Sequence, residues 1–256
     1  MAFQYIDVEE ARKRDGLRMV VVAGVPSPWG EAAKGILHIK GIEWAAVRLV
    51  YDSEPLREWT GERSGPVAIY ANEQPRSGWA EILLLAERLA PVPSLLPADP
   101  AERALAFGIS HEICGEAGLG WSRRLQLIEA SLQKAGGFTE PVAKYLGRKY
   151  GYRPETGVAA TPRVTALLGM LAARLKARHE KGSRYYVGDS LTAVDVYSAT
   201  FMALFAPLPH EQCEMAASTR AAFETRDAHT EAALDPILFR HRDMMYAEHL
   251  ELPLSL

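Results

Sequence analysis

Residues 19–41 read MVVVAGVPSPWGEAAKGILHIKG, and their pattern predicts the first elements of the chain. Its first five residues are an uninterrupted apolar run, which predicts a strand. The next residues include Gly24 and two prolines, which predict a sharp turn. Beyond the turn, apolar residues recur at steps of four and three up to Gly41, and this spacing predicts a helix. The stretch is therefore expected to form a strand, a turn and a helix.

Ser27 stands where this helix begins, with Pro28 in the favoured first turn. Backbone N–H groups and the positive end of the helix dipole converge there, so an anion beside Ser27 would be stabilised. A serine hydroxyl at that place can also donate to a thiolate. Ser27 therefore has two interpretations, a helix cap or a functional hydroxyl, and the sequence leaves both open.

The segment after the helix continues the alternation of strands and helices. Residues 43–51 (EWAAVRLVY) predict a second strand, which pairs in parallel with the first in a right-handed βαβ unit. A charged segment over 52–64 predicts a loop with a short helix. A third strand is predicted over 65–70. Because it opens with Gly65 and Pro66, the bond between them is a candidate for the cis isomer.

A turn over residues 72–75 leads to Arg76 and Ser77, ahead of an amphipathic helix over 79–89. Ser77 is the predicted N-cap of that helix. The first ninety residues are thus expected to run β-α-β, an irregular segment, and then β-β-α. A linker follows over 91–100, with four prolines in ten residues.

Everything after the linker has a helical pattern. Apolar spacing predicts helices that begin near Asp99, at Trp121 and at about Thr161. Thr192 and Asp195 have capping-box spacing ahead of a helix that is apolar almost all round. The tail after this helix is expected to wrap back over the bundle. The expected domains are an N-terminal extension over 1–18, an α/β domain over 19–90, the linker over 91–100 and an all-helical domain over 101–256.

The composition bounds the possible partners. The 256 residues are 48% hydrophobic and 24% charged, which is typical of a globular protein. The net charge of −3 offers no basic face, so neither a nucleic acid nor a membrane is an expected partner. The N-terminus lacks the apolar core of a signal peptide and no run of about eighteen apolar residues occurs, so we expect a cytoplasmic protein. The two cysteines, Cys114 and Cys213, are far apart and imply neither a disulfide framework nor a metal site.

The order of these motifs resembles the glutathione transferase superfamily, in particular bacterial-type members with a serine or omega-like active-site segment. Residues 27–30 (SPWG) are similar to the C-P-F-A or C-P-Y-C segment of omega-type and glutaredoxin-type members, with Ser27 in place of the first cysteine. Residues 188–195 (GDSLTAVD) are similar to the structural G-x-S-L-T-x-A-D motif of the C-terminal domain. The resemblance implies an α/β thioredoxin-like N-terminal domain followed by an all-α C-terminal helical bundle.

The resemblance also implies glutathione contacts. Gly65 and Pro66 resemble the cis-proline pair whose backbone meets the cysteinyl part of glutathione, and Arg76 and Ser77 resemble the Glu-Ser pair that binds the γ-glutamyl end. Two positions depart from the family pattern. Arg76 replaces an acid, which leaves the amino group of glutathione without its carboxylate partner, and Gly65 replaces the more usual Val. The implied glutathione-binding set is completed by Ser27 and Trp29.

The function that the resemblance implies is a glutathione transferase. Ser27 would activate the thiol of glutathione, a co-substrate, for attack on a small apolar electrophile by conjugation or by ether or thioether cleavage. The acceptor pocket is expected at His111, Cys114 and Trp121. Disulfide exchange is not expected, because Ser27 and Gly30 stand where such enzymes need cysteine. The resemblance also implies a homodimer. The alternative is a non-catalytic protein that uses this fold for binding or assembly.

Overall fold

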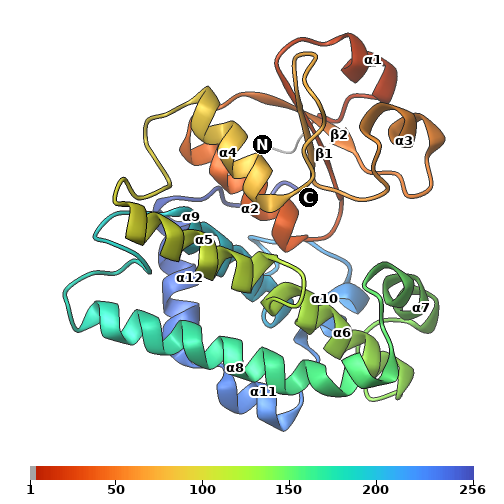
Figure 1. Ribbon diagram of the computed structural model, residues 1–256. Helices are drawn as coiled ribbons and strands as arrows, with labels where there is room; N and C mark the ends of the chain where they lie inside the picture. The colour runs from red at the N-terminus through yellow and green to blue at the C-terminus, as the bar shows by residue number, and fades with distance from the viewer. Residues whose placement is uncertain (1–3) are drawn as a thin grey trace.

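The protein, described over residues 4–256 by a computed structural model, has two parts: a small sheet with its helices, and a larger bundle of helices (Figure 1). Within the described residues the sheet has three strands in the order β2-β1-β3, and these are β1 (Leu17–Val21), β2 (Trp44–Arg48) and β3 (Val67–Tyr70). β1 pairs in parallel with β2 and antiparallel with β3. The predicted parallel βαβ unit is therefore confirmed. We call this part the sheet domain.

Helices cover both faces of the sheet, because alternate strand residues point to opposite sides. On one side, Met19 and Val21 pack in one apolar cluster with α2 (Pro28–Ile39) and α4 (Trp79–Leu89). On the other side, Val20 packs with α1 (Val8–Lys13) and α3 (Glu54–Thr60). Helix α2 begins at Pro28 and ends just before Gly41, whose φ of +62° suits the residue that follows a helix, as the sequence predicts.

Two details of the sheet domain differ from the prediction. Where a β-β pair is expected ahead of α4, the described residues form a single bridge between Ala68 and Arg76, because the chain turns sharply at Ala71 (φ +48°). The extension predicted over 1–18 overlaps the sheet, since β1 begins at Leu17. The segment ahead of β1 also contributes a bridge, from Ile6 to Val47.

The linker leads into the bundle. Helices α5 (Pro100–Cys114) and α6 (Leu119–Leu132) lie close to their expected bounds. Helix α8 (Pro154–His179) begins well before the predicted Thr161, because Pro162 lies inside the helix and not at its start. The remaining elements are α7 (Glu140–Lys149), α9 (Ala193–Phe201), the 3-10 helix η1 (Met202–Leu204), α10 (Ala217–Glu224), α11 (Ala228–Ala233) and α12 (Pro236–Glu248).

Helix α9 is the central helix of the bundle. All of its residues are buried, and it packs against α2, α5 and α12. The predicted pairing at its N-terminus is present, since the Asp195 carboxylate accepts from the N–H (2.9 Å) and the hydroxyl (2.8 Å) of Thr192. The same carboxylate accepts from the N–H of Tyr186 (3.0 Å) and lies 3.1 Å from Nε2 of His241. One buried acid thereby ties α9 to the preceding loop and to α12.

Helix α8 is the longest helix described. By length and composition alone it could cross a membrane, and it is the one helix of residues 4–256 that passes this test. In the structure it packs against α6, α11 and α12. The tail wraps over the bundle as predicted, because α12 packs against both α8 and α9.

A buried lysine fastens the linker to the sheet domain. Nζ of Lys40, at the end of α2, donates to the carbonyls of Ala90 and Pro93 (both 2.7 Å). It also pairs with Glu87 of α4 at 2.7 Å. Because the Lys40 side chain is fully buried, these contacts fix the path of the chain between the two parts.

Candidate functional site

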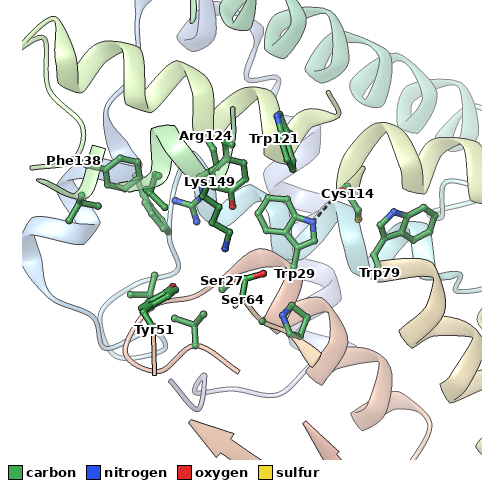
Figure 2. Close-up of a pocket in the computed structure, with 18 of the residues that line it drawn as sticks. Ser27, Trp29, Tyr51, Ser64, Trp79, Cys114, Trp121, Arg124, Phe138 and Lys149 are labelled. Carbon is green, nitrogen blue, oxygen red and sulfur yellow. Dashed lines mark hydrogen bonds between the residues drawn. The ribbon is translucent and has the colours of Figure 1, made fainter. Parts of the chain in front are cut away.

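A cavity of about 640 Å³ lies between the sheet domain and the bundle, a size typical of small-molecule sites. Turns of the sheet domain form one wall, and residues of α5, α6, α7 and α10 form the other (Figure 2). The lining residues that matter below are Ser27, Trp29, Tyr51, Ser64, Gly65, Pro66, Ser77, His111, Cys114, Glu116, Trp121, Arg124, Phe138, Lys149, Tyr150 and Phe223.

Ser27 occupies the N-cap position of α2, but its hydroxyl does not cap the helix. The Ser27 carbonyl accepts from the N–H of Glu31 (2.7 Å), but no backbone N–H of the first turn donates to its side chain. The half-buried hydroxyl therefore stays available on the cavity wall, at the positive end of the α2 dipole. Of the two interpretations that the sequence leaves open, the structure does not support the helix cap.

Trp29 links the two parts of the molecule. Its indole Nε1 donates to the carbonyl of Cys114 at the end of α5 (2.8 Å, dashed in Figure 2). Its ring meets the ring of Phe201 on α9 edge-on, with centroids 4.9 Å apart. Gly120 of α6 lies so close that a Cβ there would be 2.9 Å from the Trp29 ring. These three contacts hold Trp29 in one position between the sheet domain and the bundle.

The Gly65–Pro66 peptide bond is cis, the isomer for which the sequence makes it a candidate. Both residues line the cavity, next to Ser64. A Cβ on Gly65 would lie 3.0 Å from the carbonyl oxygen of Val20 in β1, which is tighter than ordinary contact with a backbone atom. This close approach to β1 leaves little room for a side chain at position 65 of this chain.

Ser77 lines the cavity, but it is not the N-cap of α4 as predicted. Gly78 takes that position, and its N–H donates to the Glu81 carboxylate (3.0 Å), so the helix supplies its own cap. The Ser77 hydroxyl instead donates to Oε1 of Glu62 (2.8 Å). The structure thus sets beside Ser77 a carboxylate that the sequence analysis did not single out.

Arg76 is absent from the cavity lining. Its guanidinium pairs with Glu73 at 2.7 Å, and the same carboxylate binds Arg88 of α4 at 2.6 Å. Its backbone forms the bridge to Ala68. Because these contacts engage the Arg76 side chain elsewhere, the structure does not place it with the other predicted glutathione contacts.

Two cations line the cavity that the sequence analysis missed, Arg124 on α6 and Lys149 at the end of α7 (Figure 2). Burial lowers the pKa of Arg124. Lys149 is exposed overall, but partial burial of its side chain at the cavity wall lowers its pKa, and the Arg124 charge lowers it further. A signal for Arg124 was present, since it follows Trp121 by three residues and precedes Ile128 by four on one helix face. Helix α7 gave a weak signal, because Ala143 is its one buried residue.

Comparison with known proteins identifies the fold. No protein-family profile and no curated protein matches the sequence. Solved structures do match. A glutathione S-transferase from Methylobacterium radiotolerans, in complex with glutathione sulfonate, aligns with a TM-score of 0.61 over 91% of each chain at 19% identity. A glutathione transferase family member from Pseudomonas fluorescens, with two glutathione molecules bound, aligns with a TM-score of 0.63 over 94% of each chain at 14% identity.

The protein has the glutathione transferase fold. A third structure agrees, a glutathione S-transferase from Methylobacillus flagellatus with glutathione bound, which aligns with a TM-score of 0.61 at 13% identity. That match covers 90% of this chain and 94% of the other. The predicted fold class, a thioredoxin-like domain followed by a helical bundle, is confirmed.

In this glutathione transferase fold, the three residues predicted for the acceptor pocket, His111, Cys114 and Trp121, all line the cavity. Cys114 is buried, and burial raises the pKa of its thiol well above the ordinary value, so it remains a neutral thiol. His111 is exposed. The ring of Trp121 meets that of Tyr150 edge-on at 4.9 Å. The structure brings the three residues together, and their roles stay predictions.

Within residues 4–256, no group of three or more His, Cys, Asp or Glu side chains is placed to hold a metal ion.

Proposed function

We propose that this protein binds glutathione in the cavity and activates its thiol for attack on a small electrophile. The observation that carries the proposal is the uncapped hydroxyl of Ser27 at the N-terminus of α2, in one cavity with the cis Gly65–Pro66 pair and Ser77. Three solved structures of the same fold hold glutathione or glutathione sulfonate, which supports the choice of ligand.

In this proposal glutathione lies extended along the sheet domain. Its cysteinyl part meets the backbone at Gly65 and Pro66, and its γ-glutamyl carboxylate lies by Ser77 at the N-terminus of α4. Glu62 is outside the cavity lining, but it accepts from the lining residue Ser77 at 2.8 Å and from there supplies a carboxylate for the α-amino group. Glu62 thereby replaces the acid that the family pattern places at position 76.

The sulfur of glutathione lies beside Ser27. A free thiol has a pKa of about 8.5, and a hydroxyl donor together with the N-terminus of α2 lowers that value, which raises the thiolate fraction at neutral pH. The thiol proton leaves to water. The thiolate then attacks the electrophilic carbon, a C–S bond forms, and the leaving group departs with the electron pair of the bond that breaks. Ether and thioether cleavage use the same step, with an alkoxide or a second thiolate as the leaving group.

The bundle provides the acceptor side of the cavity. Trp121, Tyr150 and Phe138 offer aromatic surface for the body of the electrophile. Disulfide exchange through a protein thiolate is disfavoured, because position 27 is serine and position 30 is glycine. The remaining cavity thiol, Cys114, is buried and its pKa is raised.

A second candidate is a non-catalytic protein that uses the fold for binding or assembly. The pairing of Arg76 with Glu73 favours it, because this pairing removes one expected glutathione contact from the cavity. The cytoplasmic location and the homodimer stay proposals that follow from composition and from the resemblance.

The proposal is tested by calorimetric titration with glutathione at pH 7, followed by rate measurements with the chromogenic aryl halide 1-chloro-2,4-dinitrobenzene. We expect binding, and a rate above the uncatalysed reaction. No detectable binding at millimolar glutathione would overturn the proposal and leave the fold unchanged. Binding without acceleration of any electrophile in a panel would favour the non-catalytic candidate.

A further inference from the structure

We propose that Arg124 and Lys149 form an anion site at the bundle side of the cavity, and that the electrophile carries a carboxylate that binds there. The inference rests on the proposed function. It changes the expected acceptor from a wholly apolar molecule to one with an apolar or aromatic body and one anionic group. Both cations line the same cavity as Ser27, one from α6 and one from the end of α7, and Figure 2 shows them together above Ser27.

The guanidinium of Arg124 is fixed by aromatic rings and has an unpaired hydrogen-bond donor. It is only 8% exposed, and its guanidinium carbon lies over the rings of Phe223 (4.9 Å) and Phe138 (5.7 Å). Its Nε is buried and has no hydrogen-bond partner. Two aromatic rings pack against the guanidinium and Tyr150 takes a hydrogen bond from it, so the N–H groups on the rest of its edge are the donors that remain for a ligand. A carboxylate matches that planar fork with two parallel hydrogen bonds.

No protein carboxylate neutralises the pair among the described residues. The ionisable neighbours that act on Arg124 are the phenols of Tyr150 and Tyr51, and burial raises the pKa of Tyr150, so it is neutral. The ionisable neighbour that acts on Lys149 is Arg124 itself. Two like charges held together in a cavity are costly without a counter-ion. A ligand anion would supply the missing charge.

The acidic residue of the cavity lining lies elsewhere. Glu116 follows Cys114 by two residues at the turn after α5. In Figure 2, Cys114 and Arg124 lie on opposite sides of the Trp29 ring. The cavity thus has a cationic side, with Arg124 and Lys149, and an acidic rim at Glu116. The electrostatic field draws an anionic acceptor toward the cationic side.

Glutathione also carries carboxylates, so it is a second source of an anion for this pair. The groups proposed to hold glutathione, namely Ser27, Gly65 and Ser77, all belong to the sheet domain. Both cations belong to the bundle, which is the acceptor side. We therefore assign the pair to the acceptor, and the glycyl carboxylate of glutathione becomes an outcome that the test separates.

The first arm of the test measures turnover. 4-Chloro-3-nitrobenzoate and 4-chloro-3-nitrobenzamide react alike, since the thiolate displaces chloride from the same ring carbon, but only the benzoate is charged. We expect kcat/KM, divided by each uncatalysed rate, to favour the benzoate about tenfold or more in the wild type. Lys149→Met and Arg124→Gln should remove that preference. Arg148→Met, an exposed neighbour outside the cavity lining, is the matched control and should keep it. If the wild type gives the same kcat/KM, divided by the uncatalysed rate, for both substrates, the inference is overturned.

The second arm measures binding without reaction. Quenching of tryptophan fluorescence by the unreactive 3-nitrobenzoate and 3-nitrobenzamide needs no glutathione, so it decides the inference even if the proposed function fails. Tighter binding of the benzoate, lost in Lys149→Met, supports the anion site, and equal binding overturns it. Because Lys149 is exposed, this variant is expected to fold even if Arg124→Gln does not.

The third arm identifies the source of the anion. Calorimetry compares glutathione with γ-glutamylcysteine, which lacks the glycyl residue, in the wild type and in Lys149→Met. We expect the variant to bind both thiols as the wild type does. A loss confined to glutathione would assign the pair to the glycyl carboxylate and overturn the inference. Failure of both proteins to bind either thiol would instead overturn the proposed function.

Discussion

One added methyl group at Gly120 is expected to disturb the contact between the two parts of the molecule at Trp29. Gly120 lies in the first turn of α6, and a Cβ there would be 2.4 Å from the ring of Phe201 and 2.9 Å from the ring of Trp29. Ordinary contact begins at 3.4 Å, so the Phe201 ring must retreat by 3.4 − 2.4 = 1.0 Å. Phe201 is fully buried, and Trp29 is bound to the Cys114 carbonyl, so neither ring moves freely.

The magnitude follows from comparison with a matched glycine. Gly108 lies in the middle of α5, and a Cβ there meets nothing within 4 Å. Exchanging glycine for alanine gains up to about 1 kcal/mol in a helix interior such as Gly108 and less in the first turn at Gly120, so most of the difference between the two variants is the cost of overpacking. Overpacking costs about 1–3 kcal/mol. For a chain of this length that corresponds to a melting temperature about 2–6 °C lower for Gly120→Ala than for Gly108→Ala.

The assay is urea unfolding and thermal melting of the wild type and both variants, without ligand and at one protein concentration. Gly108→Ala should match or exceed the wild type in the free energy of unfolding, and Gly120→Ala should fall below Gly108→Ala by the stated amount. If Gly120→Ala melts as high as Gly108→Ala, then the packing described around Trp29 is wrong.

Three further predictions concern buried charges and the glutathione site. Asp195→Ala removes the carboxylate that accepts from Tyr186, from the N–H and hydroxyl of Thr192, and from His241, so four buried donors lose their partner. The free energy of unfolding, measured with urea, should fall by about 3–5 kcal/mol, and an unchanged unfolding midpoint would contradict this. Lys40→Met leaves the carbonyls of Ala90 and Pro93 without their lysine donor and removes the cation that pairs with Glu87, so limited proteolysis should cut within 91–100 faster and stability should drop by about 3 kcal/mol; an equally protected linker would count against it. Glu62→Gln should weaken glutathione binding on the order of tenfold, while a glutathione analogue without the α-amino group should bind both proteins equally; equal loss for both ligands would exclude the proposed amino contact.

Local signals in the sequence are sufficient to predict where some of the main helices of the fold begin or end. Pro28 and Gly41 mark the two ends of α2 because proline suits the first turn and a positive φ suits glycine after the last. Thr192 and Asp195 mark the start of α9 for a similar local reason. Such signals depend on residues a few positions apart, so they can be detected without knowledge of tertiary contacts.

Signals that depend on distant partners were misinterpreted. Ser77 has the type and position of an N-cap, but Glu81 already binds the Gly78 N–H, and Glu62 lies within reach of the Ser77 hydroxyl only in the folded chain. The predicted start of α8 near Thr161 is too late, because the apolar spacing becomes clear only from Val164, whereas the helix opens at Pro154. In the first place a local preference is overridden by a contact, and in the second the opening turns carry too few large apolar residues to show the pattern.

The cationic part of the cavity has only a weak signal in the sequence for the same reason. Arg124 lies on a helix whose apolar face was recognised, but an arginine there is indistinguishable by type from a solvated surface residue. Its burial depends on Phe138 and Phe223, which are distant in sequence. Lys149 is the last residue of α7, and the apolar face of this helix is too small for the sequence to show that Lys149 lines a cavity. The cationic residues on the acceptor side of the cavity can therefore be identified only from the folded structure.

Ser27 is the residue on which the proposed function depends most, and the direct measurement is the ultraviolet absorbance of the glutathione thiolate in the complex as the pH is varied. A free thiol has a pKa of about 8.5, so we expect the thiolate of the wild-type complex to appear at lower pH, by on the order of one unit, and the Ser27→Ala complex to return toward the free value. Ser53→Ala is the matched control, because that N-cap serine accepts from the Leu56 N–H of α3 (3.4 Å) and lies outside the cavity lining. Ser53→Ala should cost up to about 1 kcal/mol of stability and keep the wild-type thiolate curve. A Ser27→Ala complex whose thiolate appears at the same pH as in the wild type would contradict the activation of glutathione by Ser27.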